Sequence, residues 1–185
     1  MTTRPGPRPL SDEALSRLLA DQRFGTLATV QRSGHPHLST MGYVWDADAR
    51  VLRFSTTADR VKVAHLRRDP HAALHVQGDD VRSFAVAEGE AELSDVTTVP
   101  GDAVGRELLG IASRFGPPED EAAFLRQLAD ERRLLIRLQV TRLYGRRSTS
   151  VVRTSPGTGD ARRAGLHGIT RSPAPDQGRL LGSCV

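Results

Sequence analysis

The sequence predicts a mainly β protein, a closed or half-closed antiparallel barrel of six strands with helices around it. Two observations predict this class: six segments of β-branched and apolar residues, and short turns of Gly, Pro, Asp and Ser that join most of them. A series of short strands joined by tight turns is typical of barrels. One domain is expected, because 185 residues suit a single core with a short appendage.

The first part of the chain, up to residue 56, contributes a helix and three strands. Ser11 is a suitable N-cap, and Leu15, Leu18 and Leu19 form an apolar stripe on a helix that ends at Asp21. Three segments rich in β-branched and apolar residues follow as the strands of a meander: residues 24–31, 37–45 and 50–56.

The part that follows adds one helix within the strand series and two helices before the last strand. The first of these, at residues 59–67, has Thr57 or Asp59 as its cap and is ended by Asp69-Pro70. Glu88-Gly89 is expected to form a bulge in a long strand. The other expected elements are strands at residues 71–77, 81–94 and 134–144 and helices at residues 103–115 and 119–131.

The chain divides into a flexible lead at residues 1–9, a folded domain at 10–145 and a tail at 146–185. The tail is rich in Ser, Gly, Pro and Arg without periodicity, which predicts disorder; a basic arm for an acidic partner is the alternative. The formal charge is +4 and the isoelectric point is about 10.1. Because the arginines of the domain are interspersed with Asp and Glu, nucleic-acid binding is not expected.

The composition also bears on compartment. No segment has the roughly 18 consecutive apolar residues that span a membrane, and the first ten residues lack the apolar region of a secretory signal. We therefore expect a cytoplasmic protein without a membrane partner. Cys184 is the only cysteine, so no internal disulfide and no cysteine metal cluster can form.

The segment at residues 54–62 (FSTTADRVK) has the groups that bind a phosphate. Ser55 and Thr56 place hydroxyls at the end of a strand, and Arg60 and Lys62 place two cations in the first turn of a helix. A helix N-terminus offers unpaired N–H groups, Arg binds two oxygens at once, and Lys adds a point charge. A bound anion is therefore physically reasonable here.

Spacing alone leaves a second interpretation equally open, in which a solvated basic turn pairs with Asp59 or Asp69. A resemblance favours the phosphate site. Three segments carry it, in this order within residues 10–144: GTLATVQRSGHPHLSTMGYVWD, LRFSTTADRVKVAHLRRDP and FAVAEGEAEL. With them the chain resembles the pyridoxamine-5'-phosphate-oxidase-like split-barrel family and, within it, the actinobacterial branch linked to the deazaflavin coenzyme F420.

The resemblance implies a six-stranded antiparallel split β-barrel of the FMN-binding type, which forms a homodimer with two cofactor sites at the interface. In such a site Arg60 and Lys62 hold the cofactor phosphate, and Ser55 and Thr56 add hydroxyl or backbone contacts. The remaining residues implied by the resemblance lie along the cofactor ring: Ser39, Thr40 and Met41 on the second strand, and Ser83 at the long strand.

For function, the resemblance implies an oxidoreductase that transfers hydride from F420 to an unsaturated or quinone-like small molecule. FMN is the alternative cofactor, because both molecules carry a phosphate beside a tricyclic ring. A non-catalytic protein that carries the cofactor is an alternative function, and haem binding is a third, although no axial ligand stands out. Water, or a hydroxyl such as that of Thr40 or Tyr43, could deliver a proton. Nothing after Tyr144 resembles the substrate-binding segment of true pyridoxamine-phosphate oxidases, so vitamin B6 oxidation is not expected.

Three histidines near these segments are not assigned to the site. His35 and His37 flank Pro36, but a zinc site needs three or four ligands, so no metal site is predicted. His65 could approach the phosphate, but it is interpreted as a residue on the exposed face of its helix and is not assigned to the site. Trp45 is expected to pack a barrel face or the dimer interface rather than to stack on a substrate.

Overall fold

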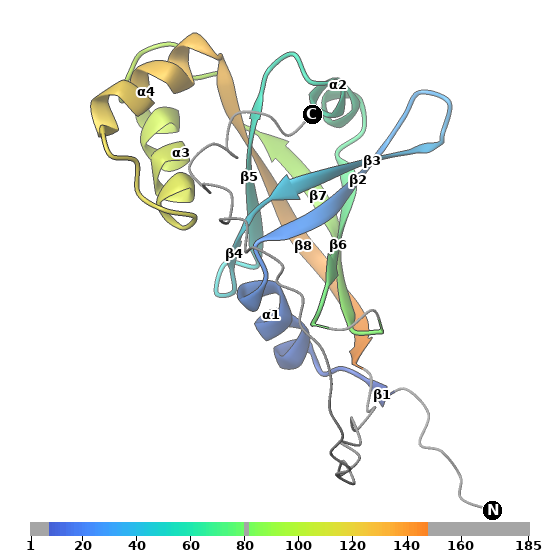
Figure 1. Ribbon diagram of the computed structural model, residues 1–185. Helices are drawn as coiled ribbons and strands as arrows, with labels where there is room; N and C mark the ends of the chain where they lie inside the picture. Colours follow the sequence, from blue (N-terminus) through green and yellow to red (C-terminus); the bar gives the residue numbers. More distant parts are fainter. Residues whose placement is uncertain (1–7, 80–81, 148–185) are drawn as a thin grey trace, which may run out of the picture. The chain divides into compact units, whose positions relative to one another are not determined.

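The computed structural model describes residues 8–79 and 82–147. Within them, eight strands form one antiparallel sheet that curls into a half-barrel, and four helices lie around it (Figure 1). This confirms the predicted fold class. The predictions of a flexible lead at residues 1–9 and a disordered tail at 146–185 fall outside the described residues, except for residues 8–9 and 146–147.

The strands of the sheet lie in the order β3-β2-β6-β7-β8-β5-β4, and β1 pairs with β8. All neighbours are antiparallel, and the long β8 pairs with β7, β5 and β1. The strands have these bounds: β1 Arg8–Pro9, β2 Phe24–Val30, β3 Pro36–Gly42, β4 Val44–Asp46, β5 Val51–Thr57, β6 His71–Gln77, β7 Phe84–Leu93 and β8 Arg133–Arg147.

The six predicted strands are present, but the second one is divided. It breaks at Tyr43 into β3 and β4, which lie at opposite ends of the strand order. Because β3 also contacts β5, the chain crosses the open side of the half-barrel at this break. Because the sheet curls, β3 and β4 can lie at its two opposite edges although they are adjacent in the sequence.

The helices are α1 Asp12–Asp21, α2 Val61–Arg68, α3 Ala103–Ser113 and α4 Glu121–Asp130. As Figure 1 shows, α1 lies at one end of the half-barrel and α2 at the other, whereas α3 and α4 lie outside, beside β5 and β8. Ser11 caps α1 by accepting from the N–H of Ala14, as predicted. None of the described helices is long and apolar enough to cross a membrane.

Two apolar clusters stabilise the fold. The larger fills the half-barrel, where the inward residues of every long strand meet Leu15 and Leu19 of α1 and Val63 and Leu66 of α2. The smaller lies between the outer side of the sheet and the α3–α4 pair, around Leu135. Because Val63 and Leu66 are buried in the larger cluster, α2 covers the end of the barrel beside β2 and β7.

The predicted bulge at Glu88-Gly89 is confirmed by a register shift between β7 and β8. Glycine is required there, because a Cβ on Gly89 would lie 1.8 Å from the carbonyl oxygen of Gln139. The bulge lets these two paired strands, the longest of the sheet, bend and twist at this point.

Candidate functional site

Helix α2 begins without a side chain that caps it. Its N-cap residue is Arg60, which has extended backbone and makes no side-chain capping bond. The prediction of Thr57 or Asp59 as the cap is wrong, because these two side chains bond to each other and the helix starts only at Val61. The first N–H groups of α2 are therefore left without a capping oxygen, which is the arrangement that favours an external anion.

Lys62 is buried in the first turn of α2 without an anionic partner among the described residues. Its exposed fraction is 4%, and no carboxylate in residues 8–79 or 82–147 lies within ion-pair distance of it. Burial lowers the pKa of Lys62, and the charge of Arg60 lowers it further. Because the buried side chain holds its ammonium group partly out of water and without a counter-charge, a bound anion would stabilise this part of the fold.

The two neighbouring carboxylates are engaged elsewhere. Asp69 accepts from the N–H of His71 at 3.1 Å and bonds its ring at 2.8 Å. Asp59 accepts from the Thr57 hydroxyl, and this bond lowers its pKa more than the charge of Arg60 does. The structure thus disfavours the interpretation in which the two cations pair with these aspartates.

The predicted hydroxyls on β5 lie on opposite faces of the sheet. Thr56 points inward, is buried and follows Phe54 on the barrel side, on which α2 also packs. Ser55 points outward, and its hydroxyl accepts from Arg133 at 3.1 Å. Strand alternation separates the two. Of the pair, Thr56 is the one on the same side as α2.

The three predicted residues on β3 are divided in the same way. Ser39 and Met41 are buried on the inner face, whereas Thr40 between them is exposed on the outer face. The hydroxyl of Ser39 is buried and has no hydrogen-bond partner among the described residues. A ligand on one side of β3 can therefore contact Ser39 and Met41, or Thr40, but not all three side chains.

Ser83 lies at the other end of the half-barrel from α2. Its carbonyl accepts from the N–H of Gly78 at 2.7 Å, at the end of β6 that is remote from α2 (Figure 1). Because β6 begins at His71, just after α2, the length of this strand puts roughly 20 Å between Ser83 and the helix. Within one chain, Ser83 does not join the site at Arg60 and Lys62.

Tyr43 is not suited to deliver a proton. Its ring is 2% exposed, its hydroxyl donates to the carbonyl of Leu19 at 2.8 Å, and burial raises its pKa strongly. The Nε1–H of Trp45 likewise donates to Ser16 at 2.9 Å. These bonds hold α1 against the segment around β4, so both aromatic residues have a packing role.

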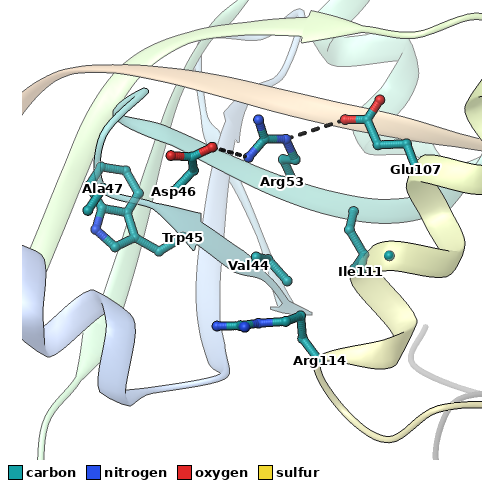
Figure 2. A pocket seen from close by; sticks show the side chains of 9 residues that line it. Val44, Trp45, Asp46, Ala47, Arg53, Glu107, Ile111 and Arg114 are labelled. Atoms are coloured by element: carbon teal, nitrogen blue, oxygen red, sulfur yellow. Dashed lines mark hydrogen bonds and ion pairs between the residues drawn. The ribbon is translucent and has the colours of Figure 1, made fainter.

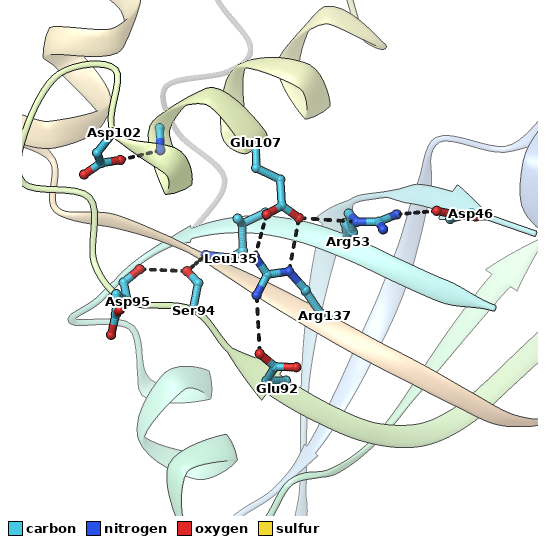
Figure 3. A network of polar contacts seen from close by, with 10 residues as sticks. Asp46, Arg53, Glu92, Ser94, Asp95, Asp102, Glu107, Leu135 and Arg137 are labelled. Carbon is cyan, nitrogen blue, oxygen red and sulfur yellow. Dashed lines mark hydrogen bonds and ion pairs between the residues drawn. The ribbon is translucent and has the colours of Figure 1, made fainter. Parts of the chain in front are cut away.

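The outer face of the sheet has a second group of arginines, and these are paired. Arg53 on β5 and Arg137 on β8 lie opposite each other and share the carboxylate of Glu107 on α3 (Figure 3). Arg53 also contacts Asp46 at 3.0 Å, and Arg137 contacts Glu92 at 3.5 Å. Each of these arginines thus has two carboxylate partners.

A cavity of about 510 Å³ adjoins this network between β4 and α3 (Figure 2). Its charged lining includes Asp46 and Glu107, which are both ion-paired with Arg53, together with the exposed Arg114. It lies on the outer side of β5, away from the inward-facing Thr56. The candidate site is therefore the α2 end of the half-barrel rather than this cavity.

The structure also brings two histidines to the site. His37 on β3 and His65 on α2 meet edge to face, with ring centroids 5.2 Å apart, and His65 bonds the Thr29 hydroxyl at 3.1 Å. Interpretation of His65 as an exposed residue is thus wrong. Alternation with Ser39 could have placed His37 on the inner face, but no sequence pattern predicts that α2 folds against it.

Comparisons with known proteins agree with this architecture. A family model described as pyridoxamine 5'-phosphate oxidase matches residues 11–145. A structure described as an F420 reductase is 27% identical, with a TM-score of 0.54 over 69% of this chain and 94% of that one. A conserved hypothetical protein from Mycobacterium tuberculosis is 26% identical, with a TM-score of 0.60 over 83% and 99%. An FAD-binding protein from Mesorhizobium loti, 18% identical with a TM-score of 0.54 over 77% and 99%, shares the fold.

Proposed function

We propose that this chain, which belongs to the pyridoxamine 5'-phosphate oxidase family, is an oxidoreductase that binds the deazaflavin coenzyme F420 through Arg60 and Lys62. FMN is the alternative cofactor. The similarity to an F420 reductase supports the deazaflavin, because that match extends over most of both chains. The family and its fold support the coarser statement of a flavin or deazaflavin protein.

The observation that carries the proposal is the buried, unpaired Lys62. Arginines elsewhere in the described chain that are half-buried have carboxylate partners, as Arg53 and Arg137 do. Lys62 is more buried than either and has none. A phosphate on the uncapped start of α2 would supply the missing charge and accept from the free N–H groups.

The residues present fit such a ligand. Lys62 and the N–H groups of α2 would hold the phosphate, and the exposed Arg60 would close over it as a bidentate donor. Thr56, Ser39 and Met41, on the inner faces of β5 and β3, would line the approach to the ring. When bound, the deazaflavin would supply hydride transfer to an unsaturated or quinone-like substrate, while the protein would supply orientation and exclude water.

A second copy of the chain would complete the site. Strand β3 pairs only with β2 among the described strands, so one of its edges is free. On the outer face beside it, Leu38 is 62% exposed and Phe24 is 57% exposed, which is unusual for large apolar side chains. A homodimer across this face would bury them and would bring Thr40, which is exposed on the same face of β3, to the interface.

The test is a fluorescence or calorimetric titration of the whole chain with F420 and, separately, with FMN. Micromolar or tighter binding of F420 alone would support the proposal, and tight binding of FMN alone would select the alternative cofactor. Binding of neither would overturn the phosphate-bearing cofactor. An assay with reduced F420 and a quinone acceptor would then separate an enzyme from a carrier, because a carrier binds the cofactor without oxidising it.

A further inference from the structure

We infer that His37 is a further ligand-binding residue of this site, which together with Ser39 holds a hydroxyl or carbonyl group of the ligand next to its phosphate. The inference rests on the proposed function, since it requires a phosphate-bearing ligand at α2. It starts from two orphaned atoms: His37 Nδ1 and Ser39 Oγ are buried, and the described part of the chain offers neither a hydrogen-bond partner.

The two atoms belong to one face of one strand. His37 and Ser39 are two residues apart on β3 and lie opposite Thr29 and Leu27 of β2, on the inner face. Helix α2 packs on the neighbouring strand β2, and the rings of His37 and His65 meet there. His65 follows Lys62 by three residues, so the two side chains are neighbours on one face of α2, and His37 contacts the ring of His65. A ligand that runs from α2 along β3 would meet His37 first and Ser39 next.

The chemistry of the pair selects a neutral group. An imidazole and a hydroxyl can each donate or accept one hydrogen bond, which suits a hydroxyl or a carbonyl. Burial, His37 and Arg68 all lower the pKa of the neighbouring His65, which disfavours a positive charge there. The charged part of the ligand is thus recognised at α2, and an uncharged part beside it is recognised at β3.

Both atoms are buried in the ligand-free protein, so contact with a ligand requires the two side chains to reorient. The Ser39 hydroxyl has three staggered positions, and the ring of His37 is half-buried rather than enclosed. Buried polar atoms without partners are costly in a folded protein, and such a cost is commonly retained where a ligand later satisfies it. At a position with only a structural role, an apolar side chain would avoid this cost. The two unpartnered polar groups on β3 therefore indicate a binding role.

The experiment uses His37→Phe, which keeps the ring that packs on His65, and Ser39→Ala, which removes only the hydroxyl. His35→Phe is the matched control, because His35 lies in the same hairpin but bonds Ser33 on the exposed side. Each site variant should weaken binding of the preferred cofactor about three- to tenfold and leave the affinity for inorganic phosphate unchanged. The melting temperature of the ligand-free variants should rise, because an unsatisfied polar group has been removed.

The outcomes separate this inference from the proposal on which it rests. If the wild type binds neither F420 nor FMN, the proposed function fails, and the inference fails with it. If the wild type binds a cofactor and both variants bind it equally well, only the inference is overturned. A lower melting temperature for both ligand-free variants would also overturn it, since the two groups would then be bonded within the fold.

Discussion

Two groups of basic residues lie on the two sides of strand β5, and they differ in what surrounds them. On the outer side, Arg53 and Arg137 share Glu107 and each contact one more carboxylate (Figure 3). At the inner end, neither Arg60 nor Lys62 forms an ion pair with a carboxylate of the described residues, although Lys62 is the more buried cation. The protein itself thus supplies counter-charges to the cations of the outer group, whereas it supplies none to Lys62.

The difference distinguishes charged residues that hold the fold together from charged residues that bind a ligand. A network in which every cation has a carboxylate holds elements together, and here it fastens α3 to β5 and β8. A buried cation without one destabilises the fold unless a ligand supplies the counter-charge. We therefore expect changes in the outer network to alter stability and changes at α2 to alter ligand affinity.

The largest expected effect is on ligand affinity at α2. The double variant Arg60→Ala with Lys62→Ala should bind the cofactor at least tenfold more weakly, because two charge-assisted contacts to the phosphate are lost. Titration of both proteins with the same cofactor measures it. Arg67→Ala, which removes an exposed cation from the same helix, is the control and should bind normally. Equal affinity of the double variant and the wild type would end the assignment of the phosphate to α2.

The next effect is on stability, through the outer network. Glu107→Gln should lower the free energy of unfolding by about 1–2 kcal/mol, because one half-buried carboxylate serves two arginines. Chemical denaturation measures this, and cofactor affinity should not change. The hydrogen bond from Arg137 holds the pKa of Glu107 below its usual value. The contribution of Glu107 to the free energy of unfolding is therefore complete above the ordinary glutamate pKa and is lost as pH falls through the lowered pKa. Glu107→Gln should remove this sensitivity to acid.

The sequence could predict the strands of this molecule better than its site. Alternation and turns placed the six strands, and the Glu88-Gly89 bulge was readable from its residues. The break at Tyr43 was not, because it depends on the curling of the whole sheet. The burial of Lys62 and the contact of His37 with His65 likewise depend on where α2 packs. The spacing of residues along the chain does not predict that packing.

A smaller effect should appear when Lys62 alone is made apolar. Lys62→Met keeps the length of the side chain and removes a buried charge, so the ligand-free protein should become more stable by about 1 kcal/mol, or roughly 2–4 °C in melting temperature. The same change at Arg137, which has partners, should destabilise. A thermal melt of the two variants tests the comparison directly. If Lys62→Met also destabilises, Lys62 has a counter-charge within the fold, and the contrast between the two regions is lost.

The smallest expected effect is on the pH dependence of binding. Burial and Arg60 lower the pKa of Lys62 in the free protein, and a bound phosphate would raise it again. Binding then favours the protonated amine, so FMN affinity should be constant on the acid side of the lowered pKa and fall a few-fold as pH rises through it. Titrations between about pH 7.5 and 10 avoid the second ionisation of the phosphate near pH 6. Lys62→Met should bind more weakly and without this decline, because the amine that links affinity to pH is absent; a decline of equal size in both proteins would assign it to another group.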